Sequence, residues 1–102
     1  MPYAYRTEAA DSDLRNIAFQ IGVESARPQV ADKVIDELID CCEQLATLSS
    51  LARLGTAASE LGQGVRLFSH QRWVVIFRYV AEGVLILRIA DGGQDYLSWK
   101  LG

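Results

Sequence analysis

Proline and long apolar runs are scarce in this sequence, and each scarcity excludes a class of protein. Only two of the 102 residues are proline while half are hydrophobic, which excludes a disordered tail or a low-complexity linker. No apolar run approaches the ~20 residues that a membrane-spanning helix requires. The opening residues, Met1–Arg6, lack the apolar segment of an export signal, so we expect a cytoplasmic protein.

Cysteine and histidine are also scarce, which limits redox and metal chemistry. The two cysteines, Cys41 and Cys42, are adjacent, and a disulfide between neighbours closes a strained ring instead of bracing a fold. A single histidine excludes a four-ligand zinc site built from cysteine and histidine alone. We expect two reduced thiols, with Cys42 in the core and Cys41 at its margin, and we predict no metal and no cofactor.

Basic residues are outnumbered by acidic ones. Ten Lys and Arg stand against thirteen Asp and Glu, which gives a net charge of −3 and a pI near 5.0. The first 50 residues hold four basic and nine acidic side chains, a net of −5, and the remainder holds six and four, a net of +2. Proteins that bind nucleic acid through its phosphates show a basic footprint, so this balance argues against direct nucleic-acid binding.

Helical periodicity dominates the first half of the chain. After a strand candidate at Tyr3–Arg6, Thr7 is placed to cap a helix that begins at the next residue. Apolar residues recur at helical spacing as far as Ile21, and after Pro28 a second stripe continues to Leu45. Two such helices with a short connection predict an antiparallel hairpin. The outer face of the second helix is acidic, and we interpret it as a solvated surface or, alternatively, as a contact for a basic protein: Asp32, Asp36, Glu37, Asp40 and Glu43.

The hydrophobic period changes in the second half, where three β-like runs follow one another over residues 65–68, 73–80 and 84–89. The middle run is apolar on both alternating faces, which is typical of a central strand covered on both sides. The whole order predicts one α+β domain over residues 1–102. It consists of an N-terminal strand, an antiparallel helical hairpin and a three-stranded antiparallel meander.

These runs belong to an ordered pattern, formed by Leu54-Gly55, Leu61–Phe68 with its Gly-Val-Arg, Trp73–Phe77, Val84–Ile89 and Asp91–Asp95. In this order the pattern resembles the RelE/ParE superfamily, the toxin components of bacterial type II toxin–antitoxin modules. The resemblance extends in element order over nearly the whole chain. It implies a small toxin that a flexible segment of a cognate antitoxin wraps and neutralises.

The resemblance implies one of two activities. RelE-like toxins cleave mRNA on the ribosome, which requires a proton acceptor, a proton donor and cationic groups around the phosphate. ParE-like toxins poison DNA gyrase. Many members have an arginine at the start of the second meander strand, where this chain has Arg72-Trp73, and basic residues around the glycine pair, where it has Asp91 and Gln94. These departures favour the ParE-like branch and a toxin that is not an enzyme.

Two sets of candidate residues follow from these alternatives. For a RelE-like mRNA endonuclease, the only plausible catalytic set is Arg66, His70, Arg72 and Arg78. For the favoured ParE-like toxin, the candidates for antitoxin or target contact are Arg66, Arg78, Arg88, Tyr96, Trp99 and Lys100. The aromatic residues of the C-terminal segment either close the core or form an exposed anchor. A third interpretation is a non-toxic binding module in an antitoxin–repressor complex.

Two further expectations concern local geometry. His70 falls in a predicted turn, where a lone histidine is usually solvated. If residues 81–83 form a three-residue loop, Arg78 lies across from Ile86 with Arg88 as its diagonal neighbour. A two-residue loop shifts the pairing of the two strands by one residue and so separates the two arginines.

Overall fold

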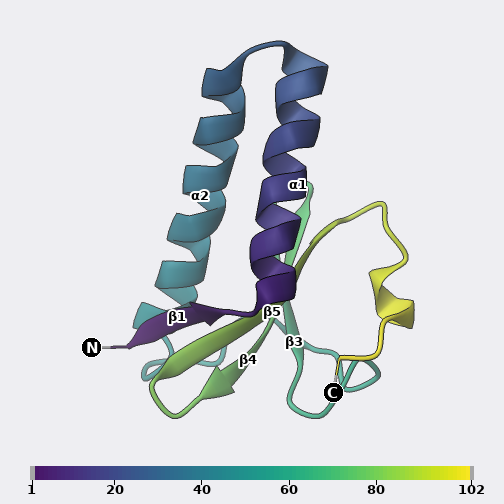
Figure 1. Ribbon diagram of the computed structural model, residues 1–102. Helices are drawn as coiled ribbons and strands as arrows, with labels where there is room; N and C mark the ends of the chain where they lie inside the picture. The colour runs from purple at the N-terminus through teal and green to yellow at the C-terminus, as the bar shows by residue number, and fades with distance from the viewer. Residues whose placement is uncertain (1, 102) are drawn as a thin grey trace.

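The computed structural model describes residues 2–101 and confirms the expected α+β class (Figure 1). A strand precedes two long helices, and the remaining strands follow them in a continuous run. The elements are β1 Tyr3–Arg6, α1 Glu8–Ser25, α2 Pro28–Thr47, β2 Thr56–Ala57, β3 Arg66–His70, β4 Trp73–Val80, β5 Gly83–Asp91 and a 3₁₀ turn at Tyr96–Ser98.

The strands form one five-stranded sheet in the order β1-β5-β4-β3-β2. β3, β4 and β5 make the expected antiparallel meander, and β1 pairs with β5 in parallel. The sequence analysis did not predict β2, whose two residues, Thr56 and Ala57, pair with β3 at the far edge. A two-residue bridge has no periodicity, so only the folded arrangement reveals it.

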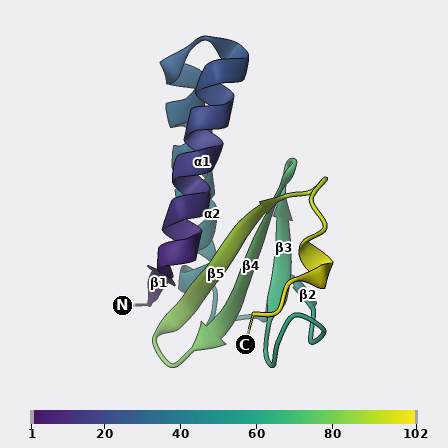
Figure 2. The same cartoon turned by 45° about the vertical axis from the view of Figure 1, so that its right-hand side comes forward.

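Local capping explains where the helices begin and end. The Thr7 hydroxyl accepts a hydrogen bond from the Ala10 N–H at 3.1 Å, which confirms the predicted cap of α1. Ala26 ends α1 in a left-handed conformation with φ 56°, and Pro28 occupies the first turn of α2. The two helices form the predicted hairpin, which covers one side of the sheet (Figure 2).

β4 is buried on both faces, as its sequence predicted. Trp73, Val75 and Phe77 join the core beneath the helices, whereas Val74 and Ile76 face a second, smaller core. This second core is covered by the loop before β3 and by the C-terminal segment, which passes the side of the sheet away from the helices (Figure 2). Its covering residues are Ala58, Leu61, Val65, Tyr96, Trp99 and Leu101.

The C-terminal segment therefore closes a core, which resolves the alternative that the sequence left open. The Leu101 N–H donates to the Leu61 carbonyl at 2.6 Å, and this bond ties the segment to the loop before β3. Gly62 makes the approach possible, since a Cβ at that position would overlap the Leu101 carbonyl oxygen.

Both cysteines are free and buried, and Cys41 lies in the core itself instead of at its margin, where the sequence placed it. Cys42 is the more enclosed, and burial raises the pKa of its thiol to about 12. Burial also raises the pKa of Cys41. Within residues 2–101, neither helix has the length and apolar character needed to cross a bilayer.

The β4–β5 register settles the geometry of the strand arginines. Val80 pairs with Gly83, so the loop has two residues and Arg78 lies opposite Leu85, not Ile86. A β-bulge at Ile76/Phe77 then leaves one residue of β5 without a partner in β4. This extra residue compensates for the loop being one residue shorter than three, so beyond the bulge the pairing is the one that a three-residue loop would give. As a result Arg88 lies opposite Ile76.

We predict that Phe77→Ala lowers the free energy of unfolding by about 3–5 kcal/mol, because it removes a fully buried ring from the helix-side core. Phe19→Ala is the matched control, since the Phe19 side chain is 76% exposed, and we expect a change of at most about 0.5 kcal/mol. Urea unfolding followed by circular dichroism measures both. Equal losses in the two variants would contradict the assignment of the core.

Candidate functional site

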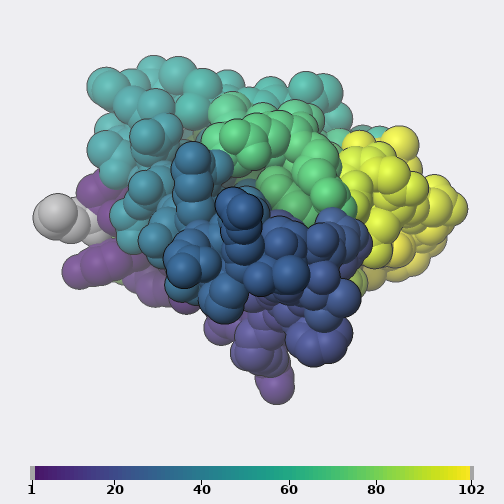
Figure 3. Space-filling view, turned by 90° about the horizontal axis from the view of Figure 1, so that it is seen from above, coloured from purple at the N-terminus to yellow at the C-terminus, as the bar shows by residue number. Residues whose placement is uncertain are grey.

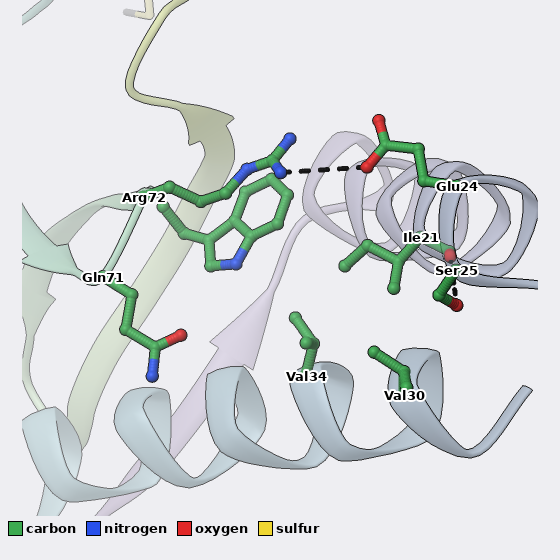
Figure 4. Close-up of a pocket in the computed structure, with 8 residues that line it drawn as sticks. Ile21, Glu24, Ser25, Val30, Val34, Gln71 and Arg72 are labelled. Carbon is green, nitrogen blue, oxygen red and sulfur yellow. Dashed lines mark hydrogen bonds and ion pairs between the residues drawn. The ribbon is translucent and has the colours of Figure 1, made fainter. Parts of the chain in front are cut away.

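An apolar surface depression lies between the tip of the helical hairpin and the β3–β4 turn (Figure 4). We call it the hairpin groove. It has a volume of about 450 Å³ and is lined by Ile21, Glu24, Ser25, Val30, Val34, Gln71, Arg72 and Trp73. Figure 3, seen from above, shows the hairpin tip packed beside this turn, with the C-terminal segment further along the same face.

The helices α1 and α2, the β3–β4 turn and Trp73 at the start of β4 build the hairpin groove. α1 contributes Ile21 from its buried stripe, and α2 contributes Val30 and Val34, one helical turn apart. The turn contributes Gln71, whose φ of 57° lies in the left-handed region. The floor is therefore apolar, and the polar side chains stand around the rim (Figure 4).

Arg72 forms the charged side of the rim and is held from three directions. Its guanidinium lies 4.4 Å from the centre of the Trp73 ring, donates to Asp91 at 2.8 Å and lies 3.9 Å from Glu24 of α1. The Gly93 N–H and the Arg72 guanidinium lower the pKa of Asp91. Arg72 thus links the sheet to the helical hairpin across the groove.

The depression continues along α2 toward its middle, where polar side chains join its apolar lining. A second section of about 450 Å³ shares Val30, Val34 and Gln71 with the hairpin groove and adds Gln29, Lys33 and Glu37. Next to it, the His70 Nε2 is buried 3.9 Å from Glu37 and makes no hydrogen bond within residues 2–101. His70 ends β3 instead of lying in a turn, because the β3–β4 connection has only two residues.

A polar cleft of about 390 Å³ adjoins the hairpin groove at Trp73 and runs between α1 and the end of β5. Asp13 of α1 dominates it. Its carboxylate accepts hydrogen bonds from Arg88 at 2.7 and 2.9 Å and from the Ile89 N–H at 2.9 Å. The bonds to Asp13 raise the pKa of Arg88, whose guanidinium also lies 4.2 Å from the centre of the Trp99 ring.

The four residues of the possible endonuclease set do not converge. Arg66 donates to the carbonyls of Leu54 and Gly55 and so holds the chain before β3. His70 shares its strand face but lies four residues away, about 13 Å along β3. Arg72 is held at the turn. Arg78 projects from the opposite face of the sheet, because it follows Phe77 by one residue in β4.

The candidates for antitoxin or target contact divide into two groups. Arg66, Arg88, Tyr96 and Trp99 are engaged in the hydrogen bonds and packing described above. Arg78 is half-buried, Lys100 is exposed, and neither makes an ion pair within the described part of the chain. The structure brings Arg88 and Trp99 together and leaves Arg78 and Lys100 available.

Apart from Arg72, the sequence analysis missed the residues of the hairpin groove. Ile21 and Val34 belong to apolar stripes that predict core positions, and nothing local marks them as lining a surface depression. The sequence did contain one indication of an apolar surface near the hairpin tip. Phe19 and Val23 of α1 lie outside the buried stripe of that helix, and both are largely exposed. Across residues 2–101, no three His, Cys, Asp or Glu side chains cluster as metal ligands do.

A helical hairpin on a mixed five-stranded sheet, with an apolar groove at the hairpin tip, defines an α+β protein with a surface suited to another polypeptide. The model of the ParE toxin of type II toxin–antitoxin systems, parDE, matches residues 5–96. Toxin ParE3 of Caulobacter vibrioides is 34% identical over 97 residues, which cover 95% of this chain and 92% of that protein. The chain belongs to the ParE toxin family.

A solved structure agrees with this assignment. The chromosomal ParDE toxin–antitoxin system from P. aeruginosa contains a chain that superposes with a TM-score of 0.68 at 26% sequence identity. The match covers 89% of this chain and 96% of that one. The RelE/ParE resemblance of the sequence and its ParE-like branch are thereby confirmed.

We predict that Asp91 stabilises the fold in a pH-dependent way. Its pKa is lowered in the folded state, so the stabilisation is present above the unfolded value of about 3.9 and is lost as the pH falls through the lower folded value. Asp91→Asn therefore lowers the unfolding free energy at pH 7 by a few tenths to about 1 kcal/mol, and by less at pH 3. Thermal unfolding at both pH values tests this, with the exposed Asp95→Asn as control. A difference independent of pH would refute the role.

We also predict that Asp13→Ala lowers the unfolding free energy by about 2–3 kcal/mol, since it leaves Arg88 and the Ile89 N–H without their acceptor. The fluorescence of Trp99 changes because the guanidinium is no longer fixed over its ring. Asp11→Ala is the control on the same helix as Asp13. It removes the exposed ion pair between Asp11 and Arg6 of β1, and we expect it to lower the unfolding free energy by at most about 1 kcal/mol. Similar losses in the two variants would contradict the distinction.

Proposed function

We propose that this chain acts in the cytoplasm as a toxin that poisons DNA gyrase, and that a cognate antitoxin neutralises it by occupying the hairpin groove. The hairpin groove carries the proposal, because an apolar floor within a polar rim is a common form of a polypeptide-binding site. Family membership supports the antitoxin as partner, since the family is defined within toxin–antitoxin pairs.

The placement of the arginines supports gyrase over mRNA as the target. Cleavage by 2′-hydroxyl attack needs acid–base and cationic groups around one phosphate. Here Arg66 and Arg72 are engaged in internal hydrogen bonds, and Arg78 projects from the other face of the sheet. A toxin that acts by binding needs no such convergence, and Arg78 and Lys100 are its candidates for target contact.

An amphipathic helix is the antitoxin element that best fits the hairpin groove. Val30 and Val34 are spaced by one turn of α2, so they present a ridge that apolar side chains of a second helix can flank. Lys33 and Glu37 border the continuation of the groove and offer one charge of each sign for orientation.

The target is tested by incubating the purified chain with DNA gyrase, ATP and supercoiled plasmid. We expect linear plasmid to accumulate after detergent and protease treatment, because a poisoned enzyme holds cleaved DNA. In cells that express the chain without antitoxin, a DNA-damage reporter switches on while pulse-labelled translation persists. Early loss of translation with a silent reporter would establish an endonuclease instead. Normal growth would establish a non-toxic binding module.

The groove is tested by Val30→Asp, with Val80→Asp as the matched control. Both valines are similarly exposed, at 39% and 36%, but only Val30 lines the hairpin groove. An acidic residue in the first turn of α2 is compatible with the helix dipole, so the variant folds. We expect Val30→Asp to weaken antitoxin binding at least tenfold, about 1.4 kcal/mol, in a calorimetric titration. Equal effects of the two substitutions would place the antitoxin elsewhere.

A further inference from the structure

β1 is the terminal strand of the sheet formed by residues 2–101, and one of its edges has no partner strand there. The Tyr3 N–H donates to Glu82 at 2.7 Å and the Thr7 N–H to Ile86 at 3.1 Å, so odd-numbered residues direct their backbone groups toward β5. In a parallel pair the alternate residues point the other way. The N–H and carbonyl groups of Ala4 and Arg6 therefore face outward, where a further strand can pair.

A cleft lies along this free edge. It has a volume of about 470 Å³ and separates β1 from the last turns of α2. Ala4 and Ala46 are small, and with Ile39 they give the cleft an apolar side, while Arg6, Glu43 and Thr47 provide its polar groups. A second depression shares Pro2 and Tyr3 with the cleft and extends it beyond the start of β1. The space beside the edge thus follows the whole strand.

The pairing of β1 with β5 depends on a glycine in β5, on the side of β1 away from the free edge. Gly83 has φ 141°, and a Cβ there would overlap the Tyr3 backbone. The close approach fixes the inner edge of β1 against β5. Because the strand is held by β5 and by the helices above it, its outer backbone groups are presented in a rigid, extended form.

The side chains around the edge indicate the charge of an occupant. Arg6 is neutralised by Asp11 at 2.6 Å. On the neighbouring face of α2, Asp36, Asp40 and Glu43 make no ion pair within residues 2–101. Ala4 faces the helix-side core, so the rings of Tyr3 and Tyr5 project from the other side of the strand, 57% and 43% exposed. Carboxylates and exposed aromatic faces both favour a cationic ligand.

We propose that the outer edge of β1 is a docking site for an extended, basic segment of a partner protein, which adds to the sheet as a further strand. Its backbone pairs with Ala4 and Arg6. Small apolar side chains enter the cleft beside Ala46. The alternate lysines or arginines lie over the tyrosine rings on the other face, and the Glu43 carboxylate at the rim of the cleft attracts the positively charged segment as a whole. This inference does not depend on gyrase as the target.

The probe is an acetylated and amidated nonapeptide, Gly-Lys-Val-Lys-Val-Lys-Val-Lys-Gly, added to the full chain labelled with ¹⁵N. We expect amide hydrogen exchange at Ala4 and Arg6 to slow at least tenfold at saturation, while exchange at Tyr5, which faces β5, stays unchanged. The same peptide with its valine and central lysine amides methylated binds at least tenfold more weakly, because it cannot form the strand ladder. Equal binding of the two peptides would refute strand addition.

Two charge reversals on α2 locate the peptide. Glu43→Lys weakens binding three- to tenfold, whereas Asp32→Lys makes the same change eleven residues away, about 16 Å along the helix, and leaves binding within twofold. Both positions are exposed, and circular dichroism checks that each variant folds.

Equal weakening of peptide binding by the two substitutions would show diffuse attraction to an acidic surface and overturn the proposal. So would amide shifts confined to the hairpin groove, or dimers of this chain paired through β1. No arm of the test contains gyrase, so this proposal and the proposed function fail separately.

Discussion

β4 is buried on both faces, and the rest of the structure follows from the need to cover each of them. The helical hairpin covers Trp73, Val75 and Phe77, but it leaves Val74 and Ile76 on the other side of the sheet. Residues 2–101 form no third α-helix for that side, and the loop before β3 and the C-terminal segment provide the cover. The C-terminal segment is therefore part of the folded core before it is available to any partner.

The same requirement determines what most of the strand and turn arginines do. The bulge in β5 turns Arg88 toward Asp13 and Trp99, where it joins α1, β5 and the C-terminal segment. Arg66 and Arg72 likewise hold a loop and a turn in place. With these cations committed to internal bonds, the surface left at the hairpin tip is mainly aliphatic, and such a surface binds by apolar contact more than by charge.

The sequence predicts those parts of the fold that depend on local periodicity. The helices, the Thr7 cap and the doubly buried β4 follow from residues within a few positions of one another. The bulge at Ile76/Phe77 and the two-residue β2 depend on pairing between distant segments, which no local pattern records. The hairpin groove was missed for the same reason, since two helices and a turn form it together and its aliphatic residues have the spacing of ordinary core positions.

α2 links the two surfaces proposed for partners and also keeps them apart. Val30 lies in the hairpin groove near the start of this helix, whereas Glu43 and Ala46 line the cleft beside β1 near its end. The thirteen residues from Val30 to Glu43 correspond to about 20 Å along the helix. Effects of substitutions separated by more than about 10 Å usually add. Because α2 is a continuous helix packed on the sheet, the separation of the two surfaces is fixed, and each surface can be examined in its own right.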